Sequence, residues 1–247
     1  MSSTGTQPGL EVPSESQAAP RLTDWQRWRE LGLLLAIAIL PSILGATFIL
    51  FHPVTGSSAG TNFRFAGGLL HQVTSILLVI YVLSRRGLNL KSLGLDFSRW
   101  TDFLVALGLA FAGFIVSATI SILVRSLSAP MTGHAPDMRD ARVIFAGASP
   151  LLMLIYSAGS SVFEETLVRG YVTTEMIGLA CPVWLASIAS VLLQTSYHVY
   201  YGLGGALVVS GHFIVFALYF SISRRLLPVI LGHLIVDFAA VGMNYLR

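Results

Sequence analysis

Seven stretches of about 20 residues without Lys, Arg or Glu limit what this chain can fold into. They are residues 31–51, 65–84, 103–124, 143–163, 183–202, 205–223 and 226–246. A helix needs roughly 20 mostly apolar residues to cross about 30 Å of hydrocarbon. Hydrophobic residues make up 54% of the chain and charged residues 11%, with a mean hydropathy of +0.75. The pattern predicts an all-α, polytopic membrane helical bundle of about seven transmembrane helices, and the absence of short alternating strands argues against a β-barrel.

The formal net charge of +3 comes from basic residues that flank the apolar stretches, so nucleic acid is not an expected partner. Basic residues precede the first stretch, follow the second and follow the sixth. The positive-inside rule then places the N-terminus in the cytoplasm. Mixed charges between the third and fourth stretches oppose this orientation; they are Arg125, Asp137, Arg139, Asp140 and Arg142. The expected localisation is multi-pass in a cell membrane, the bacterial inner membrane.

Three regions are expected. Residues 1–24 are predicted to form a disordered tail, because the first 20 residues are rich in Ser, Pro, Gly and Gln and have neither a basic start nor an apolar core of a signal peptide. Residues 25–142 hold the first three spans, and residues 143–247 hold a core of four spans. The only cysteine, Cys181, excludes an internal disulfide.

Three charged residues follow directly after the fourth apolar stretch: Glu164, Glu165 and Arg169. Each charge costs about 2.5 to 3.5 kcal/mol at the centre of a membrane helix, so the three need partners or water. Glu165 and Arg169 are four residues apart and are expected to form an ion pair on one helix face. Glu164 points about 100° away and lacks that partner, which suits it to act as a general base. The alternative is that all three lie at the membrane surface, with Glu175 continuing the same segment.

Two later stretches carry groups suited to the same chemistry. The fifth contains His198 near its end, and the seventh contains His233 and Asp237, which are four residues apart and share a helix face. Together with Glu164, these side chains could supply a water-activating base and donors for a transition state. Single polar residues elsewhere, such as His212 or the pair His71 and Gln72, are more typical of contacts between helices. We therefore expect structural roles for His71, Gln72 and His212.

These residues resemble the motifs of the CPBP family of intramembrane proteases, which comprises the type II CAAX prenyl endopeptidases and the bacterial abortive-infection and bacteriocin-processing proteins. Two glutamates, three residues and an arginine form its first motif, met by Glu164, Glu165 and Arg169. The resemblance covers about residues 145–240.

The second and third motifs are met with one departure each. His198 is present, but Gln194 stands where phenylalanine is usual four residues earlier. His233 is followed by Asp237, where asparagine or a similar polar residue is usual. An ionised Asp237 would repel an oxyanion, so we expect it to orient His233 instead. Gln194 would support the imidazole of His198 or alter the fit of the substrate.

The resemblance implies a glutamate-dependent, metal-independent endopeptidase that uses no cofactor. Its expected partners are the lipid bilayer and a peptide or protein substrate, and a membrane-anchored substrate is compatible with this activity. In this scheme Glu164 and His198 activate a water, and His233 with Asp237 stabilises the oxyanion. Glu165 and Arg169 would hold the site together.

Three alternatives remain open on the residues alone. Glu164, His198, His233 and Asp237 are all suitable zinc ligands, although no tight ligand spacing such as HExxH is present. A proton-coupled transporter also uses buried acids and histidines, and a non-catalytic scaffold is the third alternative. A shared site further requires that an irregular connection at residues 202–205 or a helix tilt bring His198 level with His233.

Overall fold

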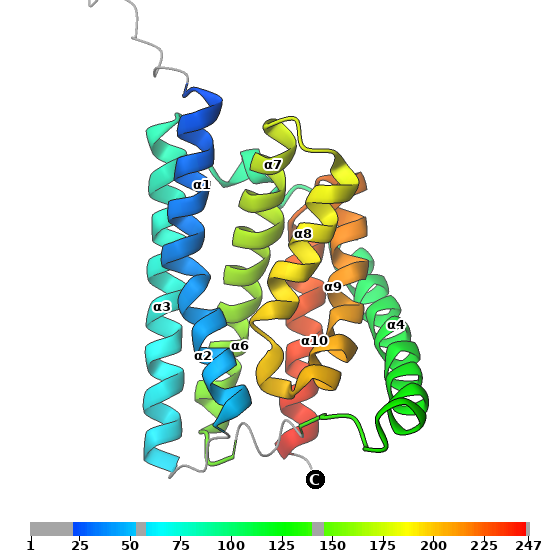
Figure 1. Ribbon diagram of the computed structural model, residues 1–247. Helices are drawn as coiled ribbons and strands as arrows, with labels where there is room; N and C mark the ends of the chain where they lie inside the picture. Colours follow the sequence, from blue (N-terminus) through cyan, green and yellow to red (C-terminus); the bar gives the residue numbers. More distant parts are fainter. Residues whose placement is uncertain (1–21, 53–57, 140–145, 246–247) are drawn as a thin grey trace, which may run out of the picture.

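The computed structural model describes residues 22–52, 58–139 and 146–245, and all regular elements in these ranges are helices (Figure 1). The predicted all-α class is therefore confirmed. The predicted tail lies outside the described residues except at its end, as do Asp140 and Arg142. In chain order the described helices are α1 (Asp24–Ala38), α2 (Leu40–Phe51), α3 (Ser58–Arg85), η1 (Leu90–Leu93), α4 (Thr101–Thr132), α6 (Pro150–Glu164), η2 (Glu165–Thr173), α7 (Thr174–Gly178), α8 (Val183–Ser196), η3 (Val199–Tyr201), α9 (Leu203–Ser223) and α10 (Leu227–Tyr245).

The number of membrane-length helices is smaller than the predicted seven. Within the described residues, four helices are long and apolar enough to cross a bilayer, and α1 with α2 makes a fifth if that bent pair is one span. The two helices meet at Ile39 with a bend of 40°, beside Pro41 in the first turn of α2. Proline removes a backbone donor and clashes with the preceding turn, which explains the break. The remaining two predicted spans correspond to the shorter apolar helices α8 and α10.

Two predicted boundaries were wrong, and both errors concern the polar residues. The fourth span does not end at Phe163 but continues through the charged residues to Gly178. The fifth ends as a helix at Ser196, followed by a turn and the short helix η3. Hydropathy alone placed the end of the fourth span too early and the end of the fifth helix too late, because hydropathy does not show which polar groups find partners.

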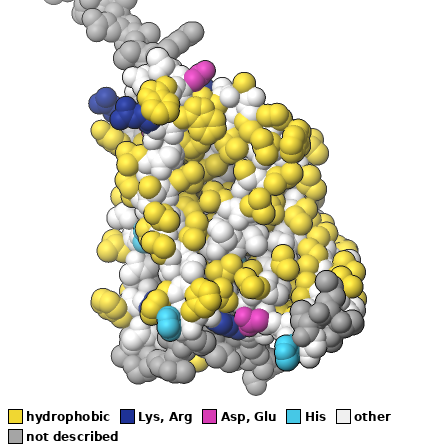
Figure 2. Space-filling model, viewed as in Figure 1, with side chains coloured by type: hydrophobic (Ala, Val, Ile, Leu, Met, Phe, Trp, Pro, Cys, Tyr) yellow, Lys and Arg dark blue, Asp and Glu magenta, His cyan; other side chains and the backbone are white. Residues whose placement is uncertain are grey.

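The helices pack with α1 and α3 on one side of the bundle and α4 on the other, with α6, α8, α9 and α10 between them (Figure 1). Apolar side chains cover the visible outer face (Figure 2), as expected for a surface that meets lipid. Small residues bring α4 and α9 together, since a Cβ atom on Gly211 would lie 2.6 Å from the backbone nitrogen of Ser117. The polar groups described next lie inside this bundle.

Candidate active site

The helix that carries the two glutamates changes its winding at the site. α6 ends at Glu164, and the next nine residues, Glu165–Thr173, form the π-helix η2, in which every residue is buried. π-helical turns are rare and occur frequently at functional sites, because they redirect side chains relative to the regular helix. Glu165 and Arg169 are completely buried, and 6% of Glu164 is exposed. These three charged side chains therefore lie inside the bundle and are not exposed on its outer surface.

Glu164 forms no ion pair with Arg169 among the described contacts and accepts hydrogen bonds from hydroxyl and amide groups instead. Its Oε1 atom accepts a hydrogen bond of 2.6 Å from the Ser160 hydroxyl on its own helix. Its Oε2 atom accepts bonds from the Gln194 amide at 2.8 Å and from the Tyr197 hydroxyl at 3.1 Å. A carboxylate has about four lone-pair positions. Three are occupied by these donors, so one stays open for a substrate or a water.

Glu165 and Arg169 form the predicted ion pair, with 3.3 Å between Oε2 and Nε. The guanidinium also donates a 3.1 Å hydrogen bond to the Phe213 carbonyl and lies over the Phe213 ring. Oε1 of Glu165 lies 2.8 Å from Nδ1 of His233. One carboxylate therefore joins the π-helix to α10, and Arg169 extends the connection to α9.

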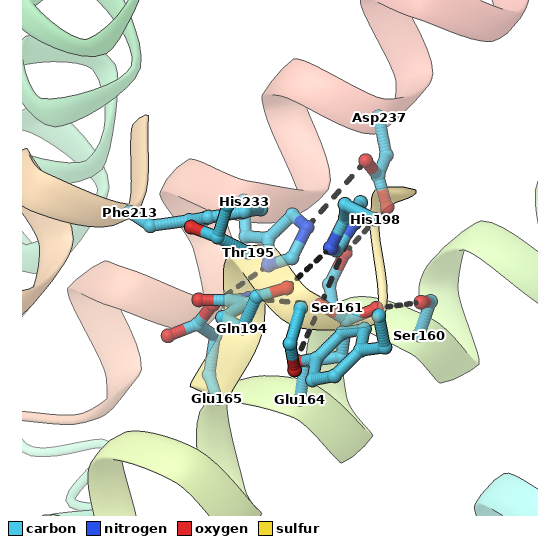
Figure 3. Close-up of polar contacts among 12 residues, drawn as sticks. Ser160, Ser161, Glu164, Glu165, Gln194, Thr195, His198, Phe213, His233 and Asp237 are labelled. Atoms are coloured by element: carbon cyan, nitrogen blue, oxygen red, sulfur yellow. Dashed lines mark hydrogen bonds and ion pairs between the residues drawn. The ribbon is translucent and has the colours of Figure 1, made fainter. Parts of the chain in front are cut away.

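His198 lies in the irregular turn between α8 and η3, with its ring beside Glu164 (Figure 3). Its Nδ1 atom is 2.8 Å from the Gln194 carbonyl oxygen. Because a carbonyl only accepts, Nδ1 carries the hydrogen, and the neutral ring then has its lone pair on Nε2. This Nε2 lies 4.0 Å from Oε2 of Glu164. The irregular connection lies at residues 197–202, earlier than the predicted residues 202–205, since α9 already begins at Leu203.

Asp237 lies one helical turn beyond His233 and faces Nε2 of its ring, opposite the Nδ1 atom that contacts Glu165. Its Oδ1 atom is 3.6 Å from Nε2 of His233, too long for a direct hydrogen bond, while Oδ2 lies 3.2 Å from the Ser161 hydroxyl. The Asp237 side chain is 26% exposed, against 8% for the side chain of Glu164. Asp237 is therefore the most accessible member of the group.

Gln194 links the two glutamates, a role that its sequence position did not reveal. Its Nε2 atom is 2.8 Å from Oε2 of Glu164 and 3.2 Å from Oε1 of Glu165. The side chain is completely buried. The substitution for phenylalanine was visible in the sequence, but its partners were not. Ser160 and Tyr197 were missed as well, because hydroxyl groups in apolar stretches are common contacts between helices.

The residues expected to be structural make contacts between helices. Nδ1 of His212 is 2.8 Å from the Ser117 hydroxyl on α4, and Nε2 of His71 is 2.9 Å from the Ala38 carbonyl oxygen. Gln72 packs against α6 next to Gly159. In the described ranges, no group of three His, Cys, Asp or Glu side chains is placed to hold one metal ion together.

Comparison with known proteins gives one match. Residues 146–239 match the model of a family described as type II CAAX prenyl endopeptidase Rce1-like. No curated protein and no solved structure matches the chain. The matched range contains the whole group of polar residues described above, and it agrees with the resemblance to the CPBP family drawn from the motifs. Residues 146–239 are therefore similar to the type II CAAX prenyl endopeptidases of this family.

Proposed function

We propose that this protein is an intramembrane endopeptidase that uses Glu164 and His198 to activate a water for hydrolysis of a peptide bond. The observation that carries the proposal is the 4.0 Å separation between Oε2 of Glu164 and Nε2 of His198. This distance exceeds a direct hydrogen bond and leaves room for one water between the carboxylate and the imidazole. Nε2 of His198 accepts from this water when the ring is neutral, and the ionised carboxylate accepts at the open lone-pair position of its Oε1 atom, since both positions on Oε2 are taken.

In the proposed reaction the water loses a proton to this pair while its oxygen attacks the carbonyl carbon of the scissile bond. The carbonyl oxygen becomes an oxyanion, and the proton then passes to the leaving amine as the C–N bond breaks. A carboxylate and an imidazole in a water-poor site are effective in both proton transfers, because little solvent competes for them.

His233 is the proposed donor to the oxyanion. Its Nδ1 is bonded to Glu165, whereas its Nε2 makes no hydrogen bond with Asp237 at 3.6 Å. When the ring is doubly protonated, the Nε2–H group is thus available to a substrate oxygen. Asp237 and Glu165 flank the ring on opposite nitrogens and fix its orientation, while Arg169 balances the charge of Glu165.

The test is cleavage of membrane-anchored peptides, with and without a prenylated C-terminal cysteine, by the purified chain in detergent. Glu164→Gln keeps an acceptor and a similar shape, so we expect it to fold normally and to lose at least about 100-fold in kcat. Thermal unfolding of the same samples separates lost chemistry from lost structure. Equal cleavage by both proteins would remove Glu164 from the mechanism, and cleavage by neither would favour a scaffold or transporter.

A metal chelator distinguishes the zinc-dependent alternative. We expect 1,10-phenanthroline to leave cleavage unchanged, since the proposed water is activated by protein side chains alone. Loss of cleavage that zinc restores would contradict the metal-independent mechanism. A close analogue that does not chelate, 1,7-phenanthroline, is the control for direct inhibition.

A further inference from the structure

A groove on the outer surface lies away from the glutamates, where α3 ends and the chain turns toward α4. Its volume is about 470 Å³, within the range of small-molecule sites. Apolar side chains form most of its surface, and a single charged residue, Lys91, takes part in it. The lining residues are Ile80, Leu83, Ser84, Leu88, Asn89, Leu90, Lys91, Leu95 and Phe97.

The groove lies at the end of the bundle where α1 begins and α3 ends (Figure 1). Basic side chains gather at this end, next to apolar ones (Figure 2). Phe97 and Trp100, in the connection between α3 and α4, are 76% and 78% exposed. Trp side chains are enriched at the level of the lipid headgroups. Trp100 therefore makes this end of the bundle the expected headgroup level.

Lys91, the one charged residue of the groove lining, differs from Arg86 and Arg225 in its ion pairs. Arg86 is bonded to Glu30 and Glu175. Arg225 lies 2.5 Å from Asp102. No ion pair joins Lys91 to any residue that the structure describes. A cation beside an apolar groove is complementary to a ligand with an anionic head and a hydrocarbon tail.

Residues 80–97, which form the groove, contain one acidic side chain, Asp96, and neighbouring residues of its loop bond it. Asp96 accepts hydrogen bonds from the backbone nitrogen of Ser98 at 3.1 Å and from its hydroxyl at 2.5 Å. These bonds, with smaller contributions from the charges of Arg225 and Lys91, lower the pKa of the Asp96 carboxyl, so it stays ionised while it bonds Ser98. Asp96 does not line the groove.

The segment that forms the groove is anchored to the core, so the groove is preformed. Leu93 is 4% exposed and packs on the π-helix, where a Cβ atom on Gly170 would lie 3.4 Å from the Leu93 Cβ. The next residue, Gly94, has a φ of +86° and accepts a 2.9 Å hydrogen bond from the nitrogen of Leu226. A rigid wall lowers the cost of ordering a ligand.

We propose that this groove binds one anionic phospholipid, with an acyl chain along the apolar wall and the phosphate at the Lys91 amine. The lipid is a resident ligand of the surface and takes no part in the proposed hydrolysis. Free phosphate shares the headgroup chemistry but cannot contact the apolar lining as an acyl chain does, so only the intact lipid is expected to bind.

Native mass spectrometry of the full chain in dodecyl maltoside tests the proposal with phosphatidylglycerol and phosphatidylcholine of identical acyl chains. We expect one phosphatidylglycerol to be retained at concentrations where phosphatidylcholine is not. One basic residue at a membrane surface contributes a factor of about five in affinity, so Lys91→Gln should weaken phosphatidylglycerol binding about fivefold. Arg99→Gln is the matched control, because Arg99 is an exposed basic residue of the same connection that does not line the groove.

The location of the acyl chain is tested with phosphatidylglycerol carrying a diazirine in its tail. Crosslinks confined to residues 80–97 support the proposal, whereas crosslinks spread over all the exposed apolar faces overturn it. Equal retention of the two lipids, or equal losses in Lys91→Gln and Arg99→Gln, also overturns it. Release of the bound lipid by millimolar inorganic phosphate would contradict the role of the apolar wall.

Discussion

The Nδ1 atom of His233 lies 2.8 Å from Oε1 of Glu165, so one buried carboxylate connects the last helix of the bundle to the π-helix. The same carboxylate faces the fully buried guanidinium of Arg169. The two adjacent glutamates therefore have different surroundings. Glu164 has an open lone-pair position and lies beside His198, while Glu165 is surrounded by groups that it holds in place.

Glu165→Gln is expected to destabilise the protein, because it leaves Arg169 buried without its counter-charge. Removing one partner of a buried ion pair costs about 3 to 5 kcal/mol. Glu164→Gln breaks no ion pair with an arginine and is expected to unfold within about 3 °C of the wild type. Thermal unfolding in detergent compares the two variants. A similar midpoint for both would contradict the assignment of different roles to the two carboxylates.

Gly211→Ala is expected to separate α4 from α9. A Cβ atom at this position would lie 2.6 Å from both the backbone nitrogen and the hydroxyl of Ser117, and backbone cannot move aside as a side chain can. Overpacking of this kind costs about 1 to 3 kcal/mol. The measurement is the unfolding midpoint in detergent, which should fall by several degrees.

Gly108→Ala is the control for that substitution. Gly108 lies in α4 with nothing within 4 Å of its Cβ position, so the added methyl group meets open space. Alanine is the better helix former, and the variant should be as stable as the wild type or more stable. An equal loss in both variants would contradict the assignment of the Gly211→Ala effect to its contact with Ser117.

The sequence predicted the fold class and most of the residues in the candidate site, because both depend on the cost of burying charge in an apolar stretch. Glu165 with Arg169 and His233 with Asp237 were expected from four-residue spacing, and the structure brings each pair together. The π-helix was not predictable, since its extra residue per turn leaves no periodic signal within nine residues. Hydropathy also overestimated the helical length of the fifth span.

Asp237→Ala is expected to lower kcat by about 10- to 100-fold, because it removes the group that faces Nε2 of His233. Asp237→Asn keeps an oxygen that can accept from Ser161 and should retain more activity. Steady-state cleavage with matched unfolding curves separates orientation of His233 from loss of structure. The same activity in both variants would show that the negative charge, and not the position of the oxygen, matters.

Gln194→Leu is expected to lower kcat without unfolding the chain. The leucine has a similar size but cannot donate to the two carboxylates, which lie 2.8 and 3.2 Å from the Gln194 amide nitrogen. Hydrogen bonds to charged groups contribute about 1.5 to 3 kcal/mol. If these hydrogen bonds position Glu164 for the reaction, kcat should therefore fall by about 10- to 100-fold while KM changes little.

Two further variants test whether the hydrogen bonds from the Gln194 amide to the two glutamates cause the change in kcat. Thr195→Val changes the neighbouring residue, whose hydroxyl bonds only the Val191 carbonyl among the described residues, and should leave kcat unchanged. Gln194→Phe introduces the residue that the family motif favours and also removes the amide donor. Wild-type cleavage by Gln194→Phe would show that packing around His198 suffices. A loss equal to that of Gln194→Leu would instead assign the effect to the amide, since the two side chains share only the absence of a donor.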